Sequence, residues 1–219
     1  LYSFAMVPWA KKHQKTLDQN ALPSPEEKIE IFIMAREKLL TAGFEAIAMD
    51  HFARTTDEMA VAAKTGKLHR NFMGYTVKPA DEYLGVGVSS IGFLEDTFVQ
   101  NRKSLRDYYR DLENSSLPIE RGLTLSRDDL IRKWVIGTLM CQFEIDKSRF
   151  SERFDIKFDD YFNAEKNHVE KCSCDGLLIA DEQKITATLL GRLFIRNICM
   201  GFDRYLESGE ARGRFSRTV

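Results

Sequence analysis

A capped helix between two apolar runs constrains the fold of this chain more than any other feature. Ser24, a following proline and Glu27 form the pattern of a capping box, so the helix is predicted to begin there. Gly43 is predicted to end it in a left-handed conformation. The apolar runs at 1–7 and 44–49 are predicted to be strands. Strand, helix and strand with short links indicate a βαβ unit, the building block of a parallel sheet.

Asp50 and His51 stand directly after the second apolar run. Ligand sites of α/β sheets lie at the carboxyl ends of the strands, so this pair is a candidate site. Asp50 can orient the ring of His51, or it can cap the turn that follows, and the sequence leaves both open. Thr55 and Glu58 are predicted to cap the next helix, which Gly66 ends.

Two further strands are predicted, over 71–77 and 84–94. The second contains three glycines within 85–92, which indicates a bulge or a ligand close to the backbone. Their spacing is not that of a phosphate loop or a Rossmann fingerprint. A helix is predicted over 101–113, and the break at 114–118 is where we place the domain boundary.

The chain beyond this boundary changes character. Helices are predicted from Ser126 and over 159–173, followed by a hairpin of 177–180 and 185–188 and a long helix over 188–206. Helices followed by a hairpin and a closing helix resemble a winged helix. That likeness raises nucleic-acid or protein binding as an alternative function. The long helix carries Arg192, Arg196 and Arg204 at spacings that either share a DNA-binding face or form an ordinary solvated face.

The composition argues against nucleic-acid binding. Among 219 residues, 32 lysines and arginines stand against 33 acidic residues, a net charge of −1. No apolar run approaches the length of a membrane span, and no signal peptide precedes the chain. We therefore expect a cytoplasmic protein. The chain starts inside an apolar run without methionine, so we expect it to be a fragment of a longer protein.

Four cysteines are too few for a disulfide scaffold. Cys172 and Cys174 are separated by one residue, where zinc and redox motifs have two or more. We expect one of these thiols to pack in the core and the other to face solvent. His168 lies on a polar helix and is predicted to be solvent-exposed.

Four stretches together resemble oxygen-independent coproporphyrinogen III oxidase, the radical enzyme of haem biosynthesis. They are Met-Asp-His-Phe-Ala at 49–53, Leu-His-Arg-Asn-Phe at 68–72, the glycine run at 85–91, and Gly-Arg-Leu-Phe-Ile-Arg-Asn-Ile-Cys-Met at 191–200. The resemblance covers essentially the whole chain and is to the carboxyl-terminal half of the oxidase. It implies an α/β (α+β) fold. In it, residues 1–118 are part of a partial TIM-like barrel, and 119–219 are a mostly helical, winged-helix-like domain that covers the substrate.

The resemblance also implies cofactors. Members of this family bind a 4Fe-4S cluster through a Cys-x-x-x-Cys-x-x-Cys motif and use two S-adenosylmethionine (SAM) molecules. A 5′-deoxyadenosyl radical removes hydrogen from a propionate of coproporphyrinogen III. Loss of carbon dioxide and an electron then leaves a vinyl group, and a second round gives protoporphyrinogen IX. No such cysteine motif occurs here, so we expect no metal ligand in this fragment, a cluster bound by the absent half, and a fragment that is inactive alone.

The family's SAM contacts correspond to Ala5 and Ile91, which from the residues alone would be read as ordinary barrel core. Met73 stands where the family often has glutamine, so it receives no site role. A substrate with four propionates needs cationic partners, and the candidates are Arg54 and Arg70.

Asp50 and His51 are the candidate catalytic residues, and Asp50 can also accept a hydrogen bond from a pyrrole N–H. Lys11, Lys12 and His13 are read as a solvated loop. The expected partners are the tetrapyrrole and an unidentified electron acceptor, with no nucleic acid, no membrane span and a monomeric state. The main alternative is a haem-binding chaperone paralogue on the same fold.

Overall fold

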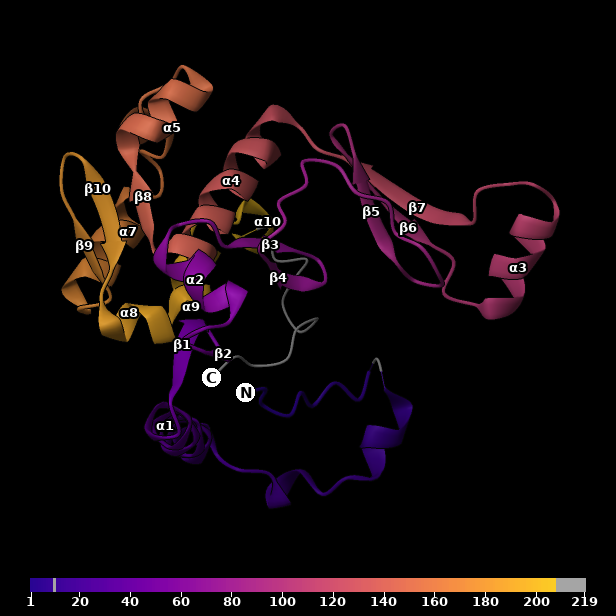
Figure 1. Cartoon of the computed structure of the whole chain (residues 1–219), viewed down its shortest axis with the longest axis horizontal. Coiled ribbons are helices and arrows are strands. Elements are labelled where there is room, and N and C mark those ends of the chain that lie inside the picture. The colour runs from indigo at the N-terminus through magenta and orange to yellow at the C-terminus, as the bar shows by residue number, and fades with distance from the viewer. Residues whose placement is uncertain (10, 208–219) are drawn as a thin grey trace. The chain divides into compact units, whose positions relative to one another are not determined.

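The computed structural model describes residues 1–9 and 11–207 and mixes helices with short strands (Figure 1). The predicted α/β (α+β) class is confirmed. The 3-10 helices are η1 (Lys12–Thr16) and η2 (Gln19–Ala21). The α-helices are α1 (Pro25–Thr41), α2 (Glu58–Lys64), α3 (Leu105–Glu113), α4 (Arg127–Gln142), α5 (Lys147–Phe154), α6 (Phe158–Tyr161), α7 (Lys166–Cys174), α8 (Leu189–Leu193), α9 (Ile195–Met200) and α10 (Arg204–Glu207).

The strands of the described residues pair antiparallel in four separate sheets, and no closed barrel is formed among them. Their order is β1–β2, β3–β4, β5–β6–β7 and β8–β10–β9. The bounds are β1 (Phe44–Ala48), β2 (His51–Arg54), β3 (His69–Asn71), β4 (Gly74–Thr76), β5 (Ile91–Leu94), β6 (Thr97–Asn101), β7 (Ile119–Thr124), β8 (Glu144–Asp146), β9 (Leu178–Ala180) and β10 (Lys184–Ala187).

The chain divides into two compact units. One is Leu1–Leu68 together with the chain from Thr138 onward, and the other is His69–Gly137. Helix α4 runs from the second unit into the first. The domain boundary near residue 118, inferred from the Asn-Ser-Ser-Leu-Pro break, stays a prediction.

The capping signals of α1 are confirmed. The Ser24 hydroxyl accepts from the Glu27 N–H at 3.2 Å, and the Glu27 carboxylate accepts from the Ser24 N–H at 2.7 Å. Gly43 takes a φ of 82°, as a left-handed helix stop requires. The N-cap predicted for α2 is wrong, because Asp57 rather than Thr55 caps the helix, with its carboxylate accepting from the Met59 N–H at 2.8 Å.

The βαβ prediction is wrong within the described residues. Only two residues, Met49 and Asp50, separate β1 from β2, so the strands form a hairpin and pair antiparallel. Residues 1–7 form no strand, and their side chains lie largely in solvent. Gln14 holds this extended segment instead. Its side-chain oxygen accepts from the Val7 N–H at 2.6 Å, and its amide nitrogen donates to the Ala5 carbonyl at 3.1 Å.

The strand predicted over 71–77 is a hairpin. The Asn71 side chain accepts from the Met73 N–H at 2.8 Å, and Gly74 has a φ of 132°, so the chain turns between β3 and β4. In the run predicted over 84–94, only Ile91–Leu94 is strand. A Cβ on Gly85 would lie 2.8 Å from the Ile91 carbonyl carbon, so this glycine lets the chain pack against its own backbone.

Asn101 holds the glycine run in place. Its buried side-chain amide donates to the Gly85 and Gly87 carbonyls and to the Ser90 hydroxyl, each at 3.0 Å. In the same unit, α3 lies beyond one end of the β5–β6–β7 sheet (Figure 1) and buries none of its residues.

Aromatic rings form the core of the carboxyl-terminal part. Phe162 lies between Phe158 and Phe202, with ring centres 4.8 and 5.3 Å away, and Phe150 packs beside them. The hairpin of β9 and β10 is confirmed, with β8 added as a third strand. The helix predicted over 159–173 is two helices, α6 and α7, because the chain turns after the buried Phe162.

The long helix predicted over 188–206 is also wrong. It is divided into α8, α9 and α10, because Phe194 leaves helical geometry and α9 ends at Gly201. His168 is not solvent-facing, since its Nε2 lies 2.9 Å from the Ile198 carbonyl and its ring meets Phe202 edge-on. Cys172 is buried and Cys174 exposed, as predicted.

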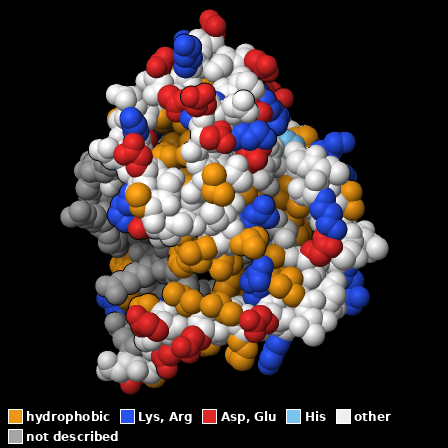
Figure 2. Space-filling view, turned by 90° about the vertical axis from the view of Figure 1, so that its left-hand side faces the viewer, with side chains coloured by type: hydrophobic (Ala, Val, Ile, Leu, Met, Phe, Trp, Pro, Cys, Tyr) orange, Lys and Arg blue, Asp and Glu red, His pale blue; other side chains and the backbone are white. Residues whose placement is uncertain are grey.

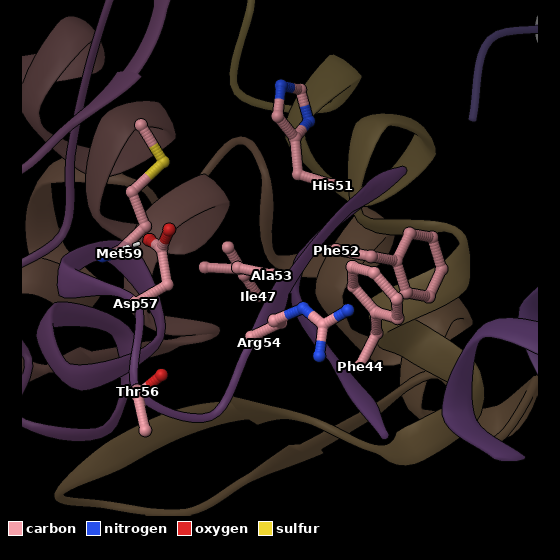
Figure 3. Close-up of a pocket in the computed structure, with 9 residues that line it drawn as sticks. All are labelled: Phe44, Ile47, His51, Phe52, Ala53, Arg54, Thr56, Asp57 and Met59. Atoms are coloured by element: carbon pink, nitrogen blue, oxygen red, sulfur yellow. Dashed lines mark hydrogen bonds between the residues drawn. The ribbon is translucent and has the colours of Figure 1, made fainter. Parts of the chain in front are cut away.

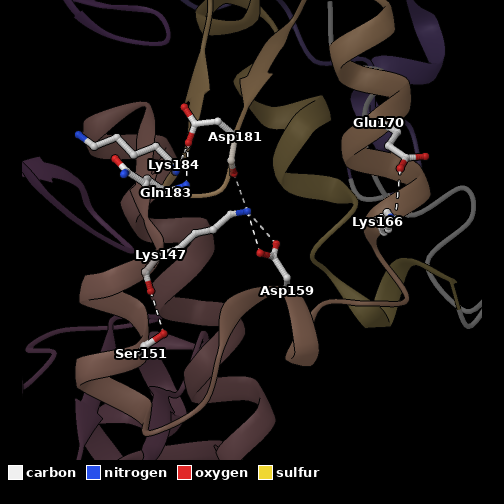
Figure 4. A network of polar contacts seen from close by, with 8 residues as sticks. All are labelled: Lys147, Ser151, Asp159, Lys166, Glu170, Asp181, Gln183 and Lys184. Carbon is white, nitrogen blue, oxygen red and sulfur yellow. Dashed lines mark hydrogen bonds and ion pairs between the residues drawn. The ribbon is translucent and has the colours of Figure 1, made fainter.

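A polar network ties α5 and α6 to the β9–β10 turn (Figure 4). The Lys147 ammonium donates to both Asp159 carboxylate oxygens, at 2.8 and 3.0 Å, and to the Asp181 carbonyl at 2.8 Å. The Asp181 carboxylate in turn accepts from the N–H groups of Gln183 and Lys184. Within the described residues, every helix is too short or too polar to cross a membrane.

Candidate active site

The predicted catalytic pair lies where the β1–β2 turn meets the first residue of β2. Met49 takes a left-handed φ of 48°, and the register shifts between Ala46 and Ala48, so the hairpin is irregular where it presents Asp50 and His51. The side chains of these two residues are 16% and 26% exposed. The pair therefore lies at the surface but is largely covered.

His51 has polar partners at both ring nitrogens. Its Nδ1 lies 2.7 Å from a carboxylate oxygen of Asp50, and its Nε2 lies 3.1 Å from the hydroxyl of the largely exposed Tyr2. The Tyr2 and His51 rings meet edge-on with centres 5.7 Å apart. The extended segment is also tied to this turn through the Leu1 nitrogen, which donates to the Asp50 carbonyl at 2.6 Å. Asp50 thus orients the ring, one of the two roles that the sequence left open.

Arg196 reaches the same turn from α9. Its Nη2 lies 3.4 Å from the second carboxylate oxygen of Asp50, and its Nε lies 3.5 Å from the sulfur of Met49. Three segments that are far apart in the sequence therefore meet at Asp50 and His51.

An open hollow of about 420 Å³ lies beside the β1–β2 hairpin (Figure 3). Phe44, Ile47 and Met59 supply apolar walls, and the polar lining includes His51 and Arg54 together with the acidic Asp57. The Arg54 guanidinium carbon lies 5.3 Å from the centre of the Phe44 ring, a cation–π contact that steadies it. A hollow with apolar walls and one guanidinium can accept an apolar ring system that carries a carboxylate.

The other predicted site residues lie elsewhere. Ala5 lies on the exposed extended segment of the same unit, with its carbonyl held by Gln14. Arg70 and Ile91 belong to the second compact unit, where Arg70 lies 4.8 Å over the Tyr75 ring and Ile91 begins β5. Lys11, Lys12 and His13 are exposed on and beside η1, and Met73 is exposed at the β3–β4 turn.

The cysteines of the described region are not arranged to hold a cluster. No group of three or more His, Cys, Asp or Glu side chains there is placed to bind a metal ion. Cys141, Cys172 and Cys199 are buried in the core, and burial raises the pKa of the Cys199 thiol to about 12. Such a thiol stays protonated at neutral pH, whereas cluster ligands are thiolates.

The side of the molecule that carries β9, β10 and α8 has apolar side chains gathered over its middle, with lysine and arginine side chains beside them (Figure 2). The exposed apolar residues of β9 and α8 are Ile179, Leu189, Leu190 and Leu193. Leu190 on α8 is 48% exposed.

Sequence reasoning missed Tyr2, Gln14, Asn101 and Arg196. Tyr2 and Arg196 are 49 and 146 residues away from their partners at the turn. No local pattern signals such a contact. Asn101 was missed because it falls in the stretch predicted to be a helix. An asparagine at the end of an apolar run is a signal for a side chain that bonds to the backbone.

Comparisons with known proteins identify the family of this chain. Residues 125–194 match the family model described as the HemN C-terminal domain. Over 223 residues the chain is 42% identical to the oxygen-independent coproporphyrinogen III oxidase of Synechocystis sp., covering 100% of this chain and 48% of that protein. A protein of the same name from Thermostichus vulcanus is 38% identical, and 67% of its length is covered. The chain belongs to the oxygen-independent coproporphyrinogen III oxidase family.

A solved structure of an oxidase of this family is also similar. It is that of coproporphyrinogen III oxidase (HemN) from Escherichia coli, described as a radical SAM enzyme. The TM-score is 0.87 at 42% identity, covering 92% of this chain and 46% of that one. The chain spans about half the length of most of the curated oxidases that it matches. The family resemblance predicted from the sequence is confirmed.

Proposed function

We propose that the complete protein carrying this sequence is an oxygen-independent coproporphyrinogen III oxidase. It oxidatively decarboxylates two propionates of coproporphyrinogen III to vinyl groups, giving protoporphyrinogen IX in haem biosynthesis. The observation that carries this proposal is the 42% identity to a curated relative of that name across the whole chain. We further propose a cytoplasmic monomer that passes electrons to an acceptor of unknown identity.

The hollow beside the β1–β2 hairpin supports a role in substrate binding. In this proposal, the Arg54 guanidinium pairs with a propionate carboxylate while the apolar walls contact the tetrapyrrole. His51 supplies a further polar contact, and Asp50 holds its ring. Arg70, stacked on Tyr75, is the candidate partner of another propionate.

The cofactors of the proposed enzyme are SAM and an iron–sulfur cluster, which when bound supply the radical that removes hydrogen from the propionate. Ala5 and Ile91 are the proposed SAM contacts. The cluster does not fit the described cysteines, since three are buried and they are not grouped. We therefore assign no cluster ligand to this chain, and we expect the 219-residue chain by itself to make no 5′-deoxyadenosine.

The test uses the complete protein, reconstituted without oxygen with iron, sulfide and reductant. We expect conversion of coproporphyrinogen III together with formation of 5′-deoxyadenosine. Arg54→Gln is expected to raise KM about tenfold, as for loss of one charge-assisted contact. Asp50→Asn is expected to lower turnover. Arg149→Gln, an exposed arginine on α5, is the matched control.

The outcomes separate the alternatives. No turnover by a complete protein with a full cluster would overturn the proposal. If that protein instead retains added haem, it belongs with the chaperone-type paralogues. If Arg54→Gln and Asp50→Asn have wild-type kinetics, the proposed reaction is unaffected but these two residues do not belong to the site.

A further inference from the structure

The Asp50 carboxylate is shared between two side chains. One oxygen lies 2.7 Å from His51 Nδ1, and the other lies 3.4 Å from Nη2 of Arg196. Asp50 is the less exposed member of its pair with Arg196, at 16% against 45%. We propose that Arg196 is a positioning residue of the candidate site. By holding Asp50, it keeps His51 in the tautomer with the proton on Nδ1 and turns Nε2 toward the Tyr2 hydroxyl. This inference rests on the proposed function of that site.

The tautomer follows from what each partner can do. A carboxylate can only accept hydrogen bonds, so the His51 nitrogen that faces it must carry a proton. In a neutral ring this leaves a lone pair on Nε2, which can accept from the Tyr2 hydroxyl 3.1 Å away. If Asp50 rotated away, His51 Nδ1 would lose its acceptor and the Nδ1–H tautomer would no longer be favoured.

Arg196 lies on a helix that is packed into the core. It belongs to α9, in which Ile195, Ile198 and Cys199 are at most 3% exposed. Its Nε also contacts the Met49 sulfur at 3.5 Å, so one guanidinium contacts both residues of the turn. Side chains mounted on packed helices hold their partners more closely than side chains on loops. Met49, with its left-handed φ, needs such support from its surroundings.

A partly exposed ion pair contributes little free energy, so the loss of the Arg196–Asp50 pair is expected to change the His51 tautomer ratio only modestly. Arg196→Gln removes the charge and is expected to change the ratio of His51 tautomers about two- to fivefold toward the Nε2–H form. Arg196→Lys keeps the charge but loses the planar fork, so it should restore the ratio only in part. Arg192→Gln is the matched control, because Arg192 lies 4.8 Å over the Phe143 ring instead.

The measurement is nitrogen-15 NMR of the histidine rings in the 219-residue chain, at a pH where the ring is neutral. We expect an Nδ1–H tautomer for His51 in the wild type and in Arg192→Gln. An Nε2–H tautomer in the wild type would overturn the proposal whether or not any variant folds. So would a ratio that changes in Asp50→Asn but not in folded Arg196→Gln.

In the complete protein, the same variants separate positioning from general stability. Arg196→Gln is expected to lower kcat or raise KM in parallel with the tautomer ratio, with partial rescue by Arg196→Lys. Equal losses in Gln and Lys variants that keep the wild-type tautomer would contradict the proposal. A complete protein without turnover would contradict the proposed function. The tautomer measurement does not depend on activity, so it tests the role of Arg196 separately.

Discussion

The packing of α7 against the end of α9 requires a residue without a side chain at position 201. A Cβ added to Gly201 would lie 2.0 Å from Cδ2 of His168, whose ring contacts the Ile198 carbonyl. Gly201→Ala is therefore expected to lower the free energy of unfolding by about 1–3 kcal/mol, as overpacking does. Urea unfolding followed by circular dichroism measures it.

The control for this substitution is Gly137→Ala, inside α4. A Cβ there meets nothing within 4 Å, so alanine should stabilise the helix by up to about 1 kcal/mol. If both variants unfold at the wild-type urea concentration, the close approach of His168 to Gly201 is wrong.

At the scale of elements, the loop before β5 depends on one amide. Asn101→Asp replaces a group that donates to three oxygen atoms with a carboxylate that can only accept. We expect a loss of about 2–3 kcal/mol from the buried unsatisfied acceptors. Hydrogen exchange should then increase at Ser89, whose N–H donates to the Arg102 carbonyl.

The exposed Asn114→Asp at the end of α3 is the control for Asn101→Asp, and it is expected to change stability by about 0.5 kcal/mol or less. Equal stability of the two variants would show that the Asn101 amide does not hold the loop.

The elements around the β9–β10 hairpin should weaken in acid. The Ser148 hydroxyl and then the Arg149 N–H hold the pKa of Asp146 below its ordinary value of 3.8. The N–H groups of Gln183 and Lys184 likewise lower the pKa of Asp181. Since both folded-state pKa values are lowered, their stabilisation is complete above about pH 5 and is lost as the pH falls through the lowered values.

A double variant, Asp146→Asn with Asp181→Asn, tests this pH dependence. Asparagine can still accept the same hydrogen bonds but does not titrate, so stability should depend less on pH between roughly pH 5 and 2. Denaturant unfolding at several pH values measures the slope. A slope equal to the wild-type slope would rule out these two carboxylates as its source.

At the scale of the whole molecule, the absence of a nucleic-acid partner stays a prediction. The net charge is −1. The arginines that suggested a DNA-binding face lie on three separate helices, and each has a local contact: Arg192 with Phe143, Arg196 with Asp50 and Arg204 with Tyr205. We expect no salt-dependent gel shift of duplex DNA at micromolar protein. A clear shift that weakens with added salt would reopen the winged-helix alternative.

Local chemistry made part of the fold predictable. The capping box at Ser24, the stop at Gly43 and the hairpin of β9 and β10 all depend on neighbouring residues, and all are confirmed. The failures share a cause as well. An apolar run at 1–7 was read as a buried strand, and the run at 84–94 as one strand, because burial and strand pairing depend on partners that a local pattern does not contain.

The sequence by itself determined the family, the mixed fold class, the capping box of α1 and the polar pair at the end of an apolar strand. These follow from residue types at short spacing. Only the tertiary structure brought Tyr2 and Arg196 to that pair, placed Gln14 against the extended segment and set His168 beside the Ile198 carbonyl. No local sequence pattern predicts these contacts. They form only when packing brings the residues together.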